Sequence, residues 1–327
     1  MSGEMIMDLR EIQSVTVLGA GIMGHGIAQS FLMGGYPVFL YDIKDPILMT
    51  AKEHIIRNLE LFRKTGVGPD RDALDVTRQL VLTTDLGIAV NESTFIVEAA
   101  PEDLKVKQAL FQNVESRCRA DAILASNTSS LTLKDIGVNI KNKKRLVTTH
   151  WFNPPHIVPT VEVVKGEQTS DETVEITYQL LEKIGKLPAK INYEIPGFLV
   201  NRIQIAMLRE VLDLYEKGLA DAAEIDKAIK GSFGFRLASI GPLLTADLGG
   251  LDVYLRVCDN LLPQIQSSSK TPKVLKDLVA QGHWGIKTGR GFYDYQVDFS
   301  KAELDSVIQK RDTEFLQRLK RLYIGKA

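Results

Sequence analysis

The feature that most constrains this chain is a glycine-rich turn between a short apolar run and a helical stretch. The run Val15–Leu18 leads directly into the sequence GAGIMG, which ends at Gly24, and a helical pattern follows it to Met33. Glycines at this spacing are a weak signal alone, but a strand before them and a helix after them are typical of a dinucleotide-binding turn. The alternative is a purely structural glycine turn in an α/β domain.

The residues of the turn have separate roles in the predicted site. Gly19 permits the tight turn off the strand, Gly21 lets a pyrophosphate approach the backbone, and Gly24 lets helix and strand pack closely. Ile22 and Met23 lie between the last two glycines, and we expect them to contact the cofactor as part of the same loop.

An acidic residue ends the second predicted strand, some twenty residues after the turn. Asp42 directly follows the apolar run Val38–Tyr41. A carboxylate there can accept hydrogen bonds from both ribose hydroxyls, and its charge repels a 2′-phosphate. This favours NAD as the cofactor, although Lys44, two positions later, leaves NADP open.

The alternation of short apolar runs with amphipathic stretches predicts the fold class. It indicates α/β architecture, with a Rossmann-type, doubly wound and mainly parallel sheet, followed by an all-helical C-terminal domain. We place the boundary at the Ile195-Pro196-Gly197 break, which gives a domain of residues 1–194 and a domain of residues 195–327. The predicted strands are residues 15–18, 38–41, 80–83, 94–98, 122–125, 146–150 and 160–164. The predicted helices of the second domain are residues 198–217, 222–230, 242–248, 251–265, 272–281 and 302–323.

Composition excludes several classes of partner. The 40 basic and 41 acidic residues give a net charge of −1, so nothing favours nucleic acid or an acidic membrane. The chain has no unbroken apolar run of membrane-spanning length, and its first residues do not resemble a secretory signal. Cys118 and Cys258 form no metal or disulfide pattern, and the histidines are scattered, so we predict a cytoplasmic protein without a metal site.

A histidine and a glutamate twelve positions apart are the candidate catalytic pair. His150 ends a predicted strand, at the sheet edge where α/β folds bind ligands, and Glu162 lies within the valine-rich strand that follows. A carboxylate among valines is costly to bury without a partner, and an imidazole is a natural one. The alternative, a core histidine with Glu162 paired elsewhere, is less favoured because of the dinucleotide turn upstream.

Seven ordered segments of the chain resemble the L-3-hydroxyacyl-CoA dehydrogenase family. They are VTVLGAGIMGHGIAQ, IVEAAPEDLKVKQALF, ILASNTSSL, THWFNPP, VEVV, PGFLVNRI and WGIKTGRGFYDY, and they extend from Val15 to Tyr295. The resemblance implies NAD-dependent, reversible oxidation of the 3-hydroxyl of an (S)-3-hydroxyacyl-CoA, a role in fatty acid metabolism and a homodimer. It leaves the acyl length, pathway and direction open.

The family's site residues can be transferred only by position. The resemblance implies that His150 is the general acid/base, Glu162 its carboxylate partner, and Ser129 and Asn201 the residues that orient the substrate. Alternatively, the hydroxyls of SNTSS only cap the next helix, and Asn201 is an ordinary surface residue. The implied cofactor-binding residues beyond the turn are Asp42, Ala99, Glu102, Lys107, Asn127 and Ser129.

One segment departs from the acyl-CoA pattern. The sequence GFRLASIGP, which contains Arg236, is similar to the branch of lambda-crystallin, L-gulonate 3-dehydrogenase and carnitine dehydrogenase. A guanidinium at this point is suited to binding a carboxylate, which a thioester lacks. A dehydrogenase of a small CoA-free 3-hydroxy acid is therefore the alternative, and a non-catalytic, crystallin-like nucleotide-binding protein is a further one.

Overall fold

The structure, a computed structural model, describes residues 9–295 and 301–324, and it divides into two compact units. The first unit runs to Leu199 and includes the chain again from Asp312, and the second runs from Val200 to Arg311. The first eight residues, on which part of the secretory-signal expectation rests, lie outside the described residues. None of the described helices combines the length and apolarity needed to cross a bilayer.

The end of the last helix, α14 (Lys301–Leu322), belongs to the first unit. A single domain boundary between residues 194 and 195 does not account for this return of the chain. Leu316 of this helix is buried against Phe62, Val67 and Ile157. The contact is long-range, and the amphipathic pattern of α14 does not specify which surface it covers.

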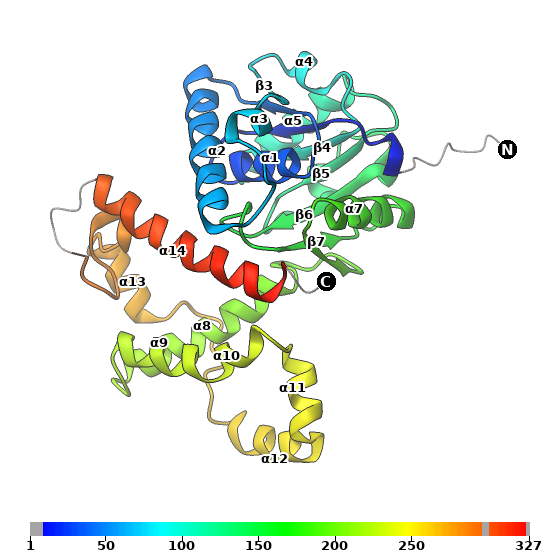
Figure 1. Ribbon diagram of the computed structural model, residues 1–327. Helices are drawn as coiled ribbons and strands as arrows, with labels where there is room; N and C mark the ends of the chain where they lie inside the picture. Colours follow the sequence, from blue (N-terminus) through cyan, green and yellow to red (C-terminus); the bar gives the residue numbers. More distant parts are fainter. Residues whose placement is uncertain (1–8, 296–300, 325–327) are drawn as a thin grey trace. The chain divides into compact units, whose positions relative to one another are not determined.

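The first unit is built on one eight-stranded sheet in the order β3-β2-β1-β4-β5-β6-β7-β8 (Figure 1). All neighbouring strands are parallel except β6 and β7, which are antiparallel. The strands are β1 (Val15–Leu18), β2 (Val38–Tyr41), β3 (Leu80–Thr83), β4 (Phe95–Glu98), β5 (Ile123–Ser126), β6 (Leu146–Trp151), β7 (Thr160–Val164) and β8 (Leu187–Ile191). The predicted Rossmann-type sheet is confirmed.

Helices cover both faces of this sheet. One face packs against α1 (Gly24–Met33), α2 (Asp45–Thr65), α3 (Ala73–Thr77) and α7 (Asp171–Lys183). The other packs against α4 (Leu86–Val90), α5 (Leu104–Glu115) and α6 (Leu133–Ile136). Because each face is covered, the central strands are buried throughout, as the continuous apolar runs predict.

Strand order reverses between β1 and β4, which lie side by side at the centre of the sheet. Their carboxyl ends therefore border the crevice where open α/β sheets bind ligands. The sequence did not predict β8, because Leu187–Ile191 is a partly exposed edge strand that contains a proline rather than a continuous apolar run.

The second unit is helical, as predicted. Its helices are α8 (Val200–Glu216), α9 (Ala222–Gly231), α10 (Phe233–Leu237), α11 (Pro242–Gly249), α12 (Leu251–Leu261), α13 (Lys273–Ala280) and the first part of α14. Among residues 200–295 and 303–311, Leu212 is the only hydrophobic side chain that is buried. This unit therefore leaves its apolar helix faces unusually exposed.

Candidate active site

The glycine turn joins β1 to α1 and is tightly packed at two of its three glycines. Gly19 has a φ of +102°, which favours glycine, and a Cβ there would lie 2.6 Å from the carbonyl oxygen of Ala99. A Cβ on Gly24 would lie 1.7 Å from the carbonyl oxygen of Gly19. No described atom lies within 4 Å of a Cβ built on Gly21. The turn is thus open at the glycine where a pyrophosphate is expected to approach.

Asp42 fixes the turn from the neighbouring strand. Its Oδ2 accepts a hydrogen bond of 2.9 Å from the backbone N–H of Ala20, while no described residue donates to Oδ1. Ile22 is 73% exposed and Met23 packs against the core, so only Ile22 presents a large apolar surface outward. Lys44 is exposed at the start of α2 and makes no capping bond.

His150 and Glu162 face one another across the antiparallel pair of strands. They are directly opposed in the register of β6 and β7, and His150 Nδ1 lies 2.7 Å from Glu162 Oε2. The histidine is 5% exposed and the glutamate 0%. Since a carboxylate accepts, Nδ1 is the donor and the proton-accepting position of the neutral ring is Nε2.

A turn at the end of the first unit completes the surroundings of this pair. Leu199 donates its backbone N–H to Glu162 Oε1 at 3.1 Å. Phe198, at a φ of +48°, lies with its ring centroid 5.5 Å from that of His150, and Phe152 lies 4.7 Å from it. Backbone conformations of this kind persist where surrounding contacts require them, often at functional sites. The imidazole is thereby flanked by two aromatic rings.

The SNTSS turn is organised by Glu102 rather than by the helix that follows it. One Glu102 oxygen accepts hydrogen bonds from the N–H groups of Ser129 and Ser130 and from the hydroxyls of Thr128 and Ser130. Partial burial acts to raise the pKa of Glu102, but these bonds and the charge of Lys107 lower it. Thr132 caps α6, so the alternative in which Ser129 or Ser130 serves as the cap is wrong.

A buried ion pair lies beneath that turn. Lys107 is 1% exposed, and its Nζ lies 2.6 Å from Glu98 Oε1, 3.3 Å from the carbonyl oxygen of Ala100 and 3.3 Å from Glu102 Oε2. Burial raises the pKa of Glu98 in spite of the lysine. Because three protein oxygens surround the ammonium, Lys107 can influence a cofactor mainly through Glu98 and Glu102.

Asn127 connects the neighbouring strands at this edge. Its N–H donates to the carbonyl oxygen of Glu98, and its side-chain Oδ1 accepts the N–H of Trp151 at 2.9 Å. Trp151 follows His150 directly, so the backbone next to the histidine is fixed to the end of β5. The end of β4 is fixed through the same asparagine.

Two predicted substrate residues belong to the second unit. Asn201 is half-buried in the first turn of α8. Arg236 is exposed on the short helix α10, and no ion pair to it occurs among the described residues. A free cysteine behaves as a small hydrophobe, which predicts burial for Cys258. It is instead exposed on α12, because that helix buries none of its residues.

Three histidines that look scattered in the sequence lie together. The ring centroids of His25 and His54 are 5.2 Å apart, and those of His25 and His156 are 6.0 Å apart. The pKa of His25 is lowered, by burial above all and then by the charges of His54 and Arg57, against a bond to the Gly21 carbonyl. Within the described ranges, no group of three or more His, Cys, Asp or Glu side chains could hold a metal ion.

Family models match both units in order. The NAD-binding domain of 3-hydroxyacyl-CoA dehydrogenase matches residues 14–194, and the C-terminal domain of the same enzyme matches residues 197–295. The chain belongs to the 3-hydroxyacyl-CoA dehydrogenase family. It is therefore an NAD-dependent oxidoreductase acting on CH–OH groups, which favours an enzyme over the non-catalytic alternative.

Relatives of this dehydrogenase differ in substrate. A 5-formyl-3-hydroxy-2-methylpyridine 4-carboxylate 5-dehydrogenase from Mesorhizobium japonicum is 30% identical over 291 residues, covering 89% of this chain and 93% of that protein. A solved structure of such a 5-dehydrogenase, described as an NAD+-dependent dismutase, has a TM-score of 0.87 at 28% identity and covers 95% and 98% of the two chains. The (S)-3-hydroxybutyryl-CoA dehydrogenase from Ralstonia eutropha has a TM-score of 0.71 at 31% identity, covering 87% and 99%.

The residues of this dehydrogenase fit the cofactor that its family uses. The space at Gly21, with the unengaged Oδ1 of Asp42 at the end of the adjacent strand, suits a pyrophosphate and a ribose hydroxyl. NAD, when bound, supplies a nicotinamide ring that accepts or returns a hydride.

Sequence reasoning missed two residues of this site. Glu98 is a carboxylate at the end of an apolar strand, which is the same signal that drew attention to Glu162. Phe198 carried no comparable signal, because its place beside His150 depends on a left-handed backbone at a non-glycine residue.

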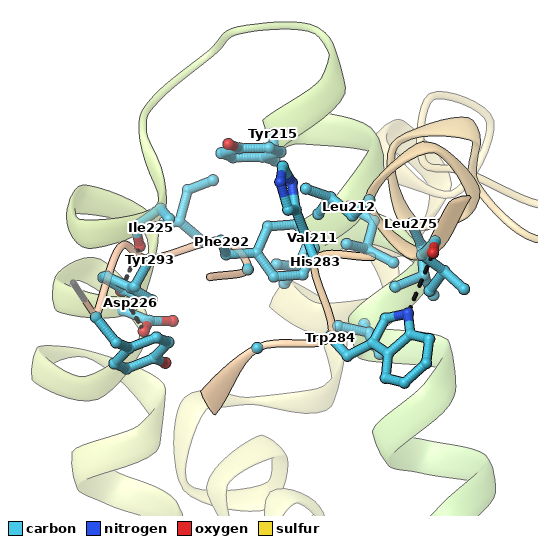
Figure 2. Close-up of a pocket in the computed structure, with 17 residues that line it drawn as sticks. Val211, Leu212, Tyr215, Ile225, Asp226, Leu275, His283, Trp284, Phe292 and Tyr293 are labelled. Carbon is cyan, nitrogen blue, oxygen red and sulfur yellow. Dashed lines mark hydrogen bonds between the residues drawn. The ribbon is translucent and has the colours of Figure 1, made fainter. Parts of the chain in front are cut away.

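The second unit of the dehydrogenase contains an apolar cavity of about 810 Å³, lined by α8, α9, α13 and the 283–295 segment (Figure 2). Tyr215, His283 and Phe292 gather on one side, and Trp284 lies on another. Tyr293 donates to Asp226 at 2.7 Å, and that bond raises the pKa of Tyr293 to about 12. The WGIKTGRGFYDY segment thus contributes to the wall of a cavity inside this unit.

Proposed function

We propose that this dehydrogenase oxidises the 3-hydroxyl of an (S)-3-hydroxyacyl-CoA to a 3-oxoacyl-CoA, reversibly, with NAD. The observation that carries the proposal is the 2.7 Å bond between His150 Nδ1 and the buried carboxylate of Glu162. A histidine held in this way beside a dinucleotide site is equipped to exchange the hydroxyl proton while hydride leaves the same carbon.

The roles within the pair follow from its hydrogen bonds. Glu162 accepts the Nδ1 proton and so leaves Nε2 to take the proton of the substrate hydroxyl. The buried carboxylate then stabilises the imidazolium that forms, since an opposite charge at this distance favours the charged ring. Phe152 and Phe198 flank the ring and limit access of water to it.

Other residues are proposed to orient the reactants. Ser129 contacts the substrate hydroxyl near the nicotinamide, and Asn201 positions the carbonyl. The dinucleotide is proposed to bind Gly19, Gly21, Ile22, Met23, Gly24, Asp42, Ala99, Glu102, Asn127 and Ser129, with Lys107 acting through Glu98 and Glu102. Glu102 supports this arrangement because its bonds hold the backbone of Ser129 in place.

A CoA-free hydroxy acid is the second candidate substrate. Arg236 favours it, because an exposed guanidinium without an ion-pair partner among the described residues can bind a carboxylate through two hydrogen bonds. The solved 5-dehydrogenase also covers 95% of this chain, compared with 87% for the (S)-3-hydroxybutyryl-CoA dehydrogenase.

A panel of CoA thioesters and free hydroxy acids, assayed by NADH formation, tests both substrates. Thioester oxidation is expected from the first proposal, and His150→Gln should reduce kcat by about 10²–10⁴-fold with NAD binding retained. Near-normal turnover of His150→Gln would contradict the proposed base.

The arginine distinguishes the two substrate classes. If the substrate is a free acid, Arg236→Ala should raise its KM at least about tenfold, the loss of a charge-assisted contact. The matched control is Arg256→Ala, which removes another exposed arginine of the same unit and should leave KM unchanged.

We further propose that the enzyme is a cytoplasmic homodimer of fatty acid metabolism. The exposed apolar faces of the second unit support a self-association surface. Two free cysteines support a reducing compartment.

A further inference from the structure

A lysine that no sequence motif singled out is buried next to β6 and β7, the antiparallel strands that carry His150 and Glu162. Lys186 precedes β8, the strand that pairs with β7, and is 7% exposed. Burial lowers the pKa of Lys186 to about 7. Burial is the only cause of this shift, so within the described ranges no carboxylate offsets the cost of burying the lysine.

The Nζ group is instead directed at the loop between β6 and β7, the strands that carry His150 and Glu162. Lys186 Nζ donates to the carbonyl oxygen of Pro155 at 2.6 Å and to that of Val158 at 3.1 Å. It also lies 5.3 Å from the ring centroid of Trp151, the residue next to His150. The two carbonyl oxygens belong to the loop that joins β6 to β7, and Trp151 is the last residue of β6.

That segment is irregular and needs fixing from outside. It leaves its strand after Trp151 and returns at Thr160, a reversal much longer than a two-residue hairpin turn. Backbone carbonyls buried in such a loop need donors from elsewhere, and Lys186 supplies them. Ser30 of α1 adds only a long bond of 3.5 Å to the Pro155 carbonyl.

The loop also lies close to the helix of the dinucleotide turn. A Cβ on Gly26 would lie 2.7 Å from Pro155, so α1 and the loop are in tight contact. The position of the loop therefore relates two parts of the site: the helix that receives the cofactor and the strands that hold His150 and Glu162.

We propose that Lys186 is a positioning residue for the proposed dehydrogenase reaction, which fixes the β6–β7 loop and thereby aligns His150 and Glu162 with the cofactor site. It touches no reacting atom. A displacement of about 1 Å in a catalytic group can reduce a rate by about 10²-fold, so loss of the two bonds should affect kcat more than binding.

Lys186→Met tests this, because methionine keeps the apolar stem and removes the donors. We expect kcat to fall at least about tenfold with KM for both reactants within threefold, and Lys186→Arg, which retains charge and donors, to recover most of the loss. The matched control is Lys190→Met on β8, which removes an exposed lysine paired with Glu175 and should leave kcat unchanged. If Lys186→Met does not fold, Lys186→Leu, which also removes the donors, replaces it with the same expectation.

A kcat of the Met or Leu variant within twofold of the unmodified enzyme overturns the proposal. So does a loss of kcat that Lys186→Arg fails to reduce and that only parallels a lower Tm.

The bridging Nδ1–H proton of His150, followed by NMR and assigned with His150→Gln, gives a readout that needs no turnover. Its resonance should shift in Lys186→Met and stay in place in Lys190→Met, and an unshifted resonance in Lys186→Met also overturns the proposal. If the unmodified enzyme oxidises nothing in the panel, the proposed function fails, while the NMR comparison still decides the role of Lys186.

Discussion

Glu162 and Lys186 are both buried charged residues, and they satisfy their hydrogen-bonding groups in different ways. Glu162 accepts from His150 and from the backbone of Leu199, so its carboxylate is held by donors on both oxygens. Lys186 donates only to carbonyl oxygens and faces an aromatic ring. Glu162 therefore pairs with a side chain that can exchange a proton, whereas Lys186 contacts only backbone oxygens and a ring, which cannot.

The lowered pKa of Lys186 predicts how stability depends on pH. With a folded pKa of about 7 against about 10.4 in the unfolded chain, the unfolded state binds more protons between these values. The free energy of unfolding should therefore rise with pH across this window, by up to about 1 kcal/mol per unit, and the increment should end near pH 10. Urea unfolding at pH 7, 8 and 9 should show this slope relative to Lys186→Met, and parallel curves would contradict it.

The strand–turn–helix element uses its glycines for two different purposes. Gly19 and Gly24 are glycines because protein atoms leave no room for a side chain. Gly21 faces open space, so the folded chain itself does not require glycine there. The difference separates packing from ligand approach within one turn.

This difference predicts opposite outcomes for two alanine substitutions. Gly21→Ala should keep Tm within about 2 °C but weaken NAD binding at least about tenfold, because its methyl group occupies the space needed by the pyrophosphate. Gly24→Ala should lower the free energy of unfolding by about 1–3 kcal/mol, as overpacking does. Thermal unfolding measures the effect on stability, and NADH fluorescence titration measures the effect on cofactor binding. Unchanged affinity in Gly21→Ala would contradict the assignment of the turn to the cofactor site.

At the scale of the whole molecule, the two units differ in how much apolar surface they bury. The first has a continuous core on each face of its sheet, and the second has Leu212 as its one buried hydrophobic side chain among residues 200–295 and 303–311. Leu251 and Leu255 are exposed four positions apart on α12 and so form an apolar stripe on one face of that helix. Surfaces of this kind are typical of an interface between subunits.

The stripe predicts where the proposed dimer can be disrupted. Leu255→Glu places a charge on it and should halve the mass measured by light scattering at micromolar concentration, because burying an unpaired carboxylate costs several kcal/mol. Asn260→Glu, an exposed polar position on the same helix, serves as the control and should not change the mass. A monomeric unmodified enzyme would contradict the prediction at once.

Local pattern was sufficient for most of the fold. Seven strands are readable because buried strands are continuous apolar runs, and the helices because their apolar faces repeat. β8 was not predicted because it is a partly exposed edge strand, which does not need a continuous apolar run. The contact between His25, His54 and His156 also escaped, because these residues lie on α1, α2 and a loop that only packing brings together.

The sequence alone determined the dinucleotide turn, the sheet class and the suspicion that a carboxylate among valines needs a partner. All three depend only on residues that are close together in the sequence. Tertiary structure decided which donor each buried acid receives: the register of β6 with β7 assigns His150 to Glu162, and the fold assigns Lys107 to Glu98. Hydrogen bonds act over about 3 Å, so they depend on how distant segments are aligned in space, which no local pattern specifies.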